Sequence, residues 1–456
     1  MCLAEGEASV GLGVYDNYDV YCVDFDGALQ VDSVGCQNGG IKGEDGLTKP
    51  GTTHTATTKF TANVKAGTVI GVYGKSALWY MNNSGGIVPD GFDQEGLKSV
   101  VQMNITGADM ENVVLPETDK LTQFNFNNSS LKTIDVSKAT ALTSLSINST
   151  TASKFEPQLE SIDLSKNVNL ESLNIQGNQN ASGKLTSLDL TNNTKLKGMG
   201  LYVQYNQISD LKIGDNELTA INVQNNKLTS LDLTKLPKLK SLYAAANLFA
   251  GEFDLTAYET IETVQLNDNQ LTGVKVNDVT KQFYVDGNKM TLATIPAQPA
   301  GMNTKNKTKQ FKYAPQADLQ VEESVSKLDL SAQLTVAKGE LNPEGYADWL
   351  NGTTTFAVKT AAGTALTEGT DYSVEAGVIS FLKNQTEKVY VEMLNTALPK
   401  FTAEAPFKTT AFTVSGTDGI RNIRFNNDGK IYNLQGVEVQ NPTKGLYIQN
   451  GKVFQK

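Results

Sequence analysis

The chain has 456 residues and a net charge of −10, with 39 Lys and Arg against 49 Asp and Glu. Nucleic acids and anionic membrane surfaces are bound through basic patches, which this composition disfavours, and no stretch approaches the roughly 18 apolar residues of a membrane span. The single histidine, His54, lies among threonines, whereas acid–base catalysis and zinc binding most often use imidazole. We therefore expect no nucleic-acid partner, no transmembrane segment, no cofactor or metal, and no enzymatic activity.

Residues 1–95 are predicted to form a β-rich cap domain. Apolar and polar residues alternate at 15–27, 57–65 and 68–73, which is typical of strands. The first residues include neither a basic segment nor a long apolar run, so we expect no complete signal peptide within the chain.

Two features of the predicted cap leave alternatives open. Cys22 and Cys36 could form a bridge in an oxidising compartment or remain buried thiols, and Cys2 could carry a lipid if a leader preceded it. An acidic cluster comprises Asp16, Asp19, Asp24 and Asp26. It could bind calcium, but it lacks the D-x-[DN]-x-[DN]-G loop, so a solvated strand face is favoured over a calcium site.

Residues 96–300 repeat a short motif, apolar-x-x-apolar-x-apolar, of which Leu228-Thr-Ser-Leu-Asp-Leu233 is one copy. Two half-repeats alternate, which gives a unit of about 21 residues. One half carries an acidic Leu/Ile-Asp-Leu segment, and the other has an asparagine three positions after its last apolar residue. These asparagines are Asn178, Asn206, Asn226, Asn247, Asn269 and Asn288.

This pattern resembles the leucine-rich repeats of bacterial surface proteins, of the short type also found in internalins. The last two apolar residues of each motif would face the interior from a short strand, and the asparagine amide would satisfy backbone groups in the following turn. Stacked coils then bury an apolar edge that one coil alone cannot bury. Ser129 and Thr150 occupy the asparagine position in the first repeats, and residues 151–157 and 179–184 are insertions.

The C-terminal part is predicted to contain two further domains. Alternating runs separated by turn residues assign residues 301–415, after a polar linker, to an immunoglobulin-like β-sandwich with Trp349 in its core. Residues 416–456 form a small β module whose Asn450-Gly451 pair predicts a hairpin turn. The order YNLQG-x-x-V…P-x-KGLYI-x-NGKV is similar to the terminal segment of many secreted Bacteroidetes proteins, some of which use it as a sorting signal; whether it is a working signal here stays open.

The predicted fold is therefore mainly β, a leucine-rich repeat solenoid flanked by an N-terminal β cap and an immunoglobulin-like β-sandwich. Its outward strand positions are the candidate binding surface, because they can vary without disturbing the core. Those positions are Asn125, Ser146, Asn174, Gly200, Asn222, Tyr243, Gln265 and Tyr284, and just beyond the strands lie Asn127, Gln176, Tyr202, Gln224 and Asn267.

Ligand contacts are predicted on the C-terminal repeats, 196–290, because tyrosine is enriched in binding hot spots. Packing of the tyrosines on neighbouring strands would explain them equally well. The predicted contact residues are Tyr202, Asn222, Gln224, Tyr243, Gln265 and Tyr284.

The favoured function is that of a non-catalytic, adhesin-like protein, secreted or displayed on a bacterial surface, with an unidentified protein or glycan ligand on the concave sheet of the repeats. A structural spacer of the envelope or matrix, without a ligand, is the alternative. A glycosidase ranks third, because the sequence shows no pair of acids with the required spacing. The oligomeric state stays open.

Overall fold

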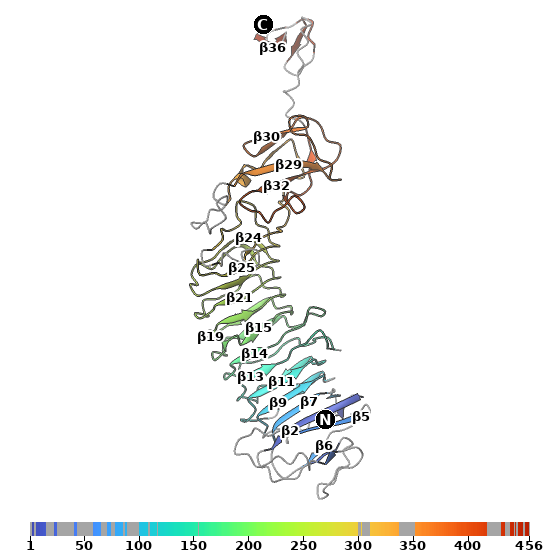
Figure 1. Ribbon diagram of the computed structural model, residues 1–456, viewed down its shortest axis with the longest axis vertical. Helices are drawn as coiled ribbons and strands as arrows, with labels where there is room; N and C mark the ends of the chain where they lie inside the picture. The colour runs from blue at the N-terminus through green and yellow to red at the C-terminus, as the bar shows by residue number, and fades with distance from the viewer. Residues whose placement is uncertain are drawn as a thin grey trace. The chain divides into compact units, whose positions relative to one another are not determined.

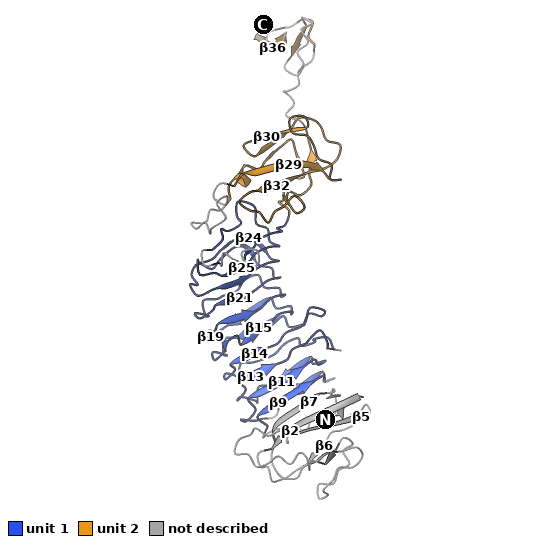
Figure 2. Ribbon diagram, in the orientation of Figure 1, with its two compact units in different colours: residues 1–317, 337–350 blue, residues 318–336, 351–456 orange. Residues whose placement is uncertain are grey.

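A computed structural model describes residues 100–107, 110–115, 117–153, 155–299, 302, 311–336 and 352–416, short segments between 430 and 455, and, before residue 100, the backbone of strands. The chain divides into two compact units, residues 1–317 with 337–350 and residues 318–336 with 351–456 (Figures 1 and 2). The described residues are strands and turns with one short 3-10 helix, Ser331–Leu334, which confirms the mainly β prediction. None of the described segments is a helix that is long and apolar enough to cross a membrane.

The first unit is built on a 13-stranded sheet. Neighbouring strands are parallel from β26 to β7, and β2 pairs antiparallel with β7 and β5. In spatial order the strands are β26 (Phe311–Lys312), β25 (Gln282–Tyr284), β23 (Thr263–Gln265), β21 (Ser241–Tyr243), β20 (Ala220–Asn222), β17 (Leu201–Tyr202), β14 (Ser172–Asn174), β13 (Ser144–Ser146), β11 (Gln123–Asn127), β9 (Gln102–Thr106), β7 (Leu78–Ser84), β2 (Gly6–Val14) and β5 (Thr58–Val64).

The second half-repeat of each coil returns on the other side of the core, where short parallel pairs form. Apolar side chains from both halves fill the space between them, and Phe124, Leu173 and Leu242 are fully buried. These coils form the leucine-rich repeat solenoid that the motif predicts. The pairs are β10 (Asn112–Val114) with β12 (Thr133–Asp135), β15 (Ser187–Leu190) with β18 (Asp210–Ile213), β16 (Lys197–Gly198) with β19 (Glu217–Leu218), and β22 (Ala250–Asp254) with β24 (Gln270–Lys275).

Before residue 100 the described backbone includes two further small sheets. β1 (Cys2–Leu3) pairs with β8 (Ile87–Val88), and β3 (Cys22–Asp24) lies between β4 (Ile41–Lys42) and β6 (Gly71–Tyr73). The open questions about the Cys22–Cys36 bridge, the acidic cluster and His54 concern side chains outside the described residues.

The second unit contains three antiparallel sheets and one short parallel pair, β27 (Ser324–Val325) with β34 (Thr413–Val414). Its buried residues include an aromatic pair, Phe381 and Phe412, whose rings lie 5.9 Å apart. Trp349 lies outside the described residues, and the immunoglobulin-like assignment and the four-domain division stay predictions. The antiparallel sheets are β29 (Thr354–Thr360) with β32 (Val389–Asn395) and β33 (Phe407–Lys408); β28 (Lys327–Asp329) with β31 (Val378–Phe381) and β30 (Tyr372–Glu375); and β35 (Ile431–Asn433) with β36 (Leu446–Gln449) and β37 (Lys452–Gln455).

A ladder of buried asparagines joins successive coils of the solenoid. The Asn247 Nδ2 group donates to the carbonyl of Val223 in the preceding coil, at 3.0 Å, and to two carbonyls of its own turn. Its Oδ1 atom accepts from the Leu228 N–H at 3.0 Å. Asn226, Asn269 and Asn288 repeat this pattern. Each amide thus satisfies backbone groups that no strand pairing reaches.

The ladder continues beyond the six asparagines. Gln316 takes the equivalent position after β26, donating to the Val285 carbonyl at 2.9 Å and accepting from the Met290 N–H at 3.1 Å. At the opposite corner of the coils, Asn167 and Asn193 are fully buried. Asn193 donates hydrogen bonds to the backbone carbonyls of Leu164 and Asn167. The spacing rule for the first ladder does not identify these additional residues.

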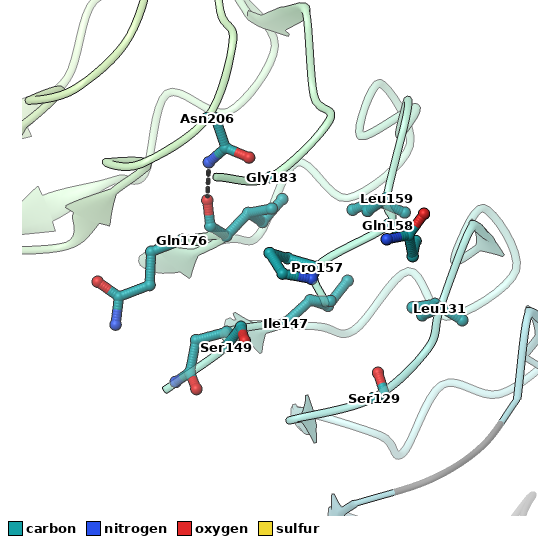
Figure 3. A pocket seen from close by; sticks show the side chains of 12 residues that line it. Ser129, Leu131, Ile147, Ser149, Pro157, Gln158, Leu159, Gln176, Gly183 and Asn206 are labelled. Carbon is teal, nitrogen blue, oxygen red and sulfur yellow. Dashed lines mark hydrogen bonds between the residues drawn. The ribbon is translucent and has the colours of Figure 1, made fainter. Parts of the chain in front are cut away.

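Buried serines, Ser129 and Ser149, take the place of the ladder asparagines in the coils before Asn178. A cavity of about 20 Å³ opens between coils near the first insertion (Figure 3). Ser129, Ser149, Pro157 and Asn206 are among its lining residues. Ser149, rather than Thr150, is the buried polar residue of its coil, and it accepts a hydrogen bond from Asn178 at 2.9 Å. The cavity has room for about one water molecule, which is too little for an organic ligand.

We predict that Asn247→Ala destabilises the first unit by about 2–3 kcal/mol, because it leaves the buried Leu228 N–H and the Val223 carbonyl without their partner. Asn192→Ala, on an exposed turn residue, is the matched control and should change stability by less than about 0.5 kcal/mol. Urea unfolding followed by circular dichroism measures both effects. Equal midpoints for the two variants would contradict a supporting role for the ladder.

A row of exposed aspartates closes turns on the other half-repeat. Asp189, Asp232 and Asp254 each accept from the hydroxyl and the backbone N–H of the threonine two residues later, at 2.6 Å and 2.9–3.0 Å. The hydroxyl bond first, and then the N–H bond, lowers the pKa of each carboxyl. Asp135 and Asp163 make the same turn with the N–H groups of serines.

These aspartates predict a pH-dependent stability. Because their pKa values are lowered in the folded state, their contribution is complete above the ordinary aspartate pKa of about 3.9 and is lost as the pH falls through the lower folded-state pKa. The double variant Asp189→Asn and Asp232→Asn keeps an acceptor in each turn but does not titrate. It should be slightly less stable than the native chain at pH 6, and the difference should shrink by pH 2.5, as urea midpoints at the two pH values would show. A difference that stays constant would exclude this linkage.

Candidate ligand-binding face of the parallel sheet

One outward residue from each coil aligns into a row across the parallel sheet, which we call the outer row. Neighbouring positions lie about 4.8 Å apart, the spacing of paired strands. Because each strand buries the residues on both sides of this position, the outer row projects away from the core. In register order it comprises Asn104, Asn125, Ser146, Asn174, Tyr202, Asn222, Tyr243, Gln265, Tyr284 and Lys312.

Tyrosines and amides alternate in the C-terminal half of the outer row. Tyr202, Tyr243 and Tyr284 are separated by Asn222 and Gln265, so the tyrosines recur every second coil, about 9.6 Å apart. All five side chains are half-buried. Within the described part of the chain, the hydroxyl groups of Tyr202 and Tyr243 make no hydrogen bond, so they are available to a ligand.

The placement of Tyr202 corrects the sequence alignment of its coil. The spacing puts Gly200 at the outward strand position and Tyr202 beyond the strand, whereas the register pairs Tyr202 with Asn174 and Asn222. The additional residues Gly198 and Met199 lengthen the segment before this strand and cause the shift. In the other coils, the last buried strand residue lies three positions before the ladder asparagine. Applied to Asn206, this rule gives Val203, and Tyr202 then falls at the outward position before it.

An open hollow of about 270 Å³ lies at the centre of this half of the row. Its lining includes five of the predicted contact residues, Tyr202, Asn222, Gln224, Tyr243 and Gln265, together with Leu201, Ala220, Ile221 and Met199. Ala220, one outward position before Asn222, contributes only a small side chain to this lining. Met199, whose side chain is 56% exposed, adds an apolar group that the sequence analysis did not single out.

The face around the outer row carries no charge over eight coils. From β9 to β23, all of which the structure describes, the outer row and the two flanking outward rows contain amides, Ser, Thr, Tyr, Ala and Gly. Hydrogen bonds connect these side chains between and within coils. Asn125 donates to Asn104, Gln204 donates to Gln176, and Gln224 donates to Asn222 at 3.1 Å. The amides are therefore held in place before any ligand arrives.

Charged residues lie at the C-terminal end and along one edge of this face. Lys312 pairs with the buried Asp286 at 2.6 Å, and the hydrogen bond that the lysine donates to Asp286 raises the pKa of the lysine. Along the edge, acids and lysines of successive coils pair at 2.7–2.8 Å, so their charges compensate each other. These pairs are Glu171–Lys197, Glu217–Lys238 and Glu262–Lys281.

No group of three or more His, Cys, Asp or Glu residues that could hold a metal occurs in the described ranges. What the face offers instead is neutral hydrogen-bonding capacity next to aromatic rings. Amides provide both donors and acceptors, and a tyrosine combines an apolar ring with a polar end. This chemistry suits non-covalent recognition of a neutral ligand.

No protein-family model and no curated protein matches the chain. Among solved structures, YopM from Yersinia enterocolitica WA-314 is similar at 15% identity and a TM-score of 0.36, over 52% of this chain and 53% of that chain. The functional domain of InlJ from Listeria monocytogenes is similar at 14% identity and a TM-score of 0.27, over 77% of this chain and 93% of that one. The internalin InlF from Listeria monocytogenes is similar at 15% identity and a TM-score of 0.30, over 48% of this chain and 76% of that chain. The chain thus spans about half the length of the YopM structure.

We predict that Gly200 is required for the close packing of its coil against the preceding one. A Cβ atom at this position would lie 2.5 Å from the Glu171 carbonyl oxygen and 2.6 Å from that of Lys197, so Gly200→Ala should cost about 1–3 kcal/mol of stability. Gly273→Ala is the matched control, because its Cβ would make only ordinary contacts at 3.8 Å. Thermal unfolding of both variants measures the effect, and a stable Gly200→Ala chain would show that the backbone can move apart.

Proposed function

We propose that this chain is a non-catalytic binding protein that holds a protein or glycan ligand on the sheet face around Tyr202, Asn222, Gln224, Tyr243, Gln265 and Tyr284. The observation that carries the proposal is the hollow, because five of these residues line it. Binding sites are typically concave, mainly apolar and supplied with a few polar groups. The Ile221 and Leu201 floor, the two tyrosines and the three amides match this description.

The proposal includes a secreted or cell-surface location with an adhesin-like role. The similarity of residues 416–456 to the terminal segment of secreted Bacteroidetes proteins supports this location. The fold supports a binding role, since a solenoid presents a long surface whose outward residues are independent of its core. Fold alone does not identify a ligand, so the test concerns the face itself.

The test is a binding screen of the purified chain against immobilised glycans and purified matrix proteins, run in parallel with the double variant Tyr202→Ala and Tyr243→Ala. Loss of these two aromatic side chains should weaken binding to any true ligand of the face by about tenfold or more, the effect of removing a hot spot. The variant should keep the native circular dichroism spectrum, because both side chains are outward.

A ligand whose affinity is equal for the native chain and the double variant would place binding elsewhere. A screen without any ligand would favour the alternative, a structural spacer of the envelope or matrix.

A further inference from the structure

We propose that the outer row from Tyr202 to Tyr284 binds a neutral, extended β-1,4-linked oligosaccharide that lies along the row, with about one sugar ring per coil. This inference rests on the proposed function and names the ligand class for the same face. It is carried by three features of the described residues: the repeat distance of the tyrosines, the absence of charge, and the hollow between Tyr202 and Tyr243.

The repeat distance fits a β-1,4-linked chain. Each ring of such a chain is turned over relative to the ring before it, so equivalent ring faces and edges recur every second ring. The outer row has the same period, because a tyrosine and an amide alternate from Tyr202 to Tyr284. The advance per coil, about 4.8 Å, is close to the length of one sugar ring along an extended chain, so the two repeats stay in step over the five coils.

The chemistry of the face fits a sugar ring as well. The C–H groups of a pyranose ring pack against an aromatic ring, as other apolar groups do, while its hydroxyls both donate and accept hydrogen bonds. Asn222 and Gln265 supply both functions between the tyrosines. The Asn222 amide is held by its hydrogen bond with Gln224, at 3.1 Å, so less conformational entropy is lost on binding.

Charge argues against an anionic polysaccharide. The chain has a net charge of −10, and in the described coils from β9 to β23 the face has no basic side chain to offset this repulsion. Lys312, at the end of the row, is already paired with Asp286 at 2.6 Å. A neutral chain needs no counter-charge and desolvates at a lower cost than a charged one.

The sheet geometry also disfavours an added peptide strand. Strand addition requires an unpaired sheet edge, but the strands from β17 to β25 have a neighbour on both sides. A proline-rich peptide, which uses aromatic grooves and repeats about every 9.3 Å, remains the other class that matches the tyrosine spacing. It has few hydroxyl or amide donors to match Asn222 and Gln265, so we favour the oligosaccharide and include the peptide in the test.

The hollow provides the subsite in which one ring would be most completely enclosed. Tyr202 and Tyr243 line it on either side of Asn222, and Ala220 and Ile221 line it with side chains of modest size. Its volume of about 270 Å³ is sufficient for a hexose ring. The ring at Asn222 should therefore contribute most of the affinity, and the rings toward Tyr284 should add to it.

The experiment is isothermal titration calorimetry of the full chain with four hexamer probes: β-1,4-linked glucose, mannose and xylose oligosaccharides, and the anionic β-1,4-linked mannuronate. A nonaproline peptide is the fifth probe. At least one neutral hexamer should bind, and mannuronate and nonaproline should bind at least tenfold more weakly. Shorter oligomers of the bound sugar should lose affinity stepwise, and affinity should level off at about five rings, which span the row of about 19 Å.

Three variants locate the binding. Tyr243→Ala should weaken the best oligosaccharide by at least tenfold, and Ala220→Glu, which places a charge in the hollow, should do the same. Tyr390→Ala is the matched control: Tyr390 is a half-buried strand residue of the second unit, in β32, and its loss should leave affinity unchanged. Circular dichroism melts establish that each variant is folded, and if Tyr243→Ala unfolds, Tyr243→Leu replaces it.

The inference is overturned if no neutral hexamer binds, if nonaproline or mannuronate binds best, or if Tyr243→Ala and Ala220→Glu leave affinity unchanged. These results are distinct from failure of the proposed function. If a matrix protein or the peptide binds and requires Tyr243, the face is a binding site and only the ligand class is wrong. If neither these probes nor the members of the screen bind to the face, both the inference and the proposed function fail.

Discussion

The solenoid depends on one constraint, which is that every coil must satisfy the backbone groups of its turn without a strand partner. The buried amides do this from Asn206 to Asn288, and Gln316 does it for the final coil. Each amide bonds to its own coil and to the one before it, so the ladder links neighbouring coils directly. With the parallel pairing of the strands, it sets a constant advance of about 4.8 Å per coil.

Constant coil spacing turns a one-dimensional sequence pattern into straight rows of side chains. Inward rows are almost entirely apolar and fully buried, so they leave little room for variation. Outward rows have no such restriction. Along one edge of the sheet face, Glu171, Glu217 and Glu262 pair with lysines. From β9 to β23 the sheet face itself carries no charged side chain, so it offers a ligand only neutral hydrogen-bonding groups and aromatic rings.

Departures from regularity matter for the candidate site. The additional residues Gly198 and Met199 leave the apolar Met199 side chain exposed beside the sheet. The next coil has the apolar Ala220 at the outward position before Asn222, where its register partner is Ser241. Met199 and Ala220 both line the hollow, and the asparagine ladder remains in place at Asn206 and Asn226.

The sequence by itself determined the repeat, because buried leucines and ladder asparagines recur at spacings that only one coil geometry satisfies. It also placed Asn222, Gln224, Tyr243, Gln265 and Tyr284 at outward positions, since the rule that a strand alternates inward and outward residues applies to each coil separately. It misplaced Tyr202 because the pattern breaks within that coil, and it did not show that Gln316 continues the ladder because a glutamine falls outside the asparagine rule. Only the tertiary structure decided that tyrosines and amides alternate along one row and enclose a hollow, because these residues are separated by about 20 positions each and meet only when the coils stack in register.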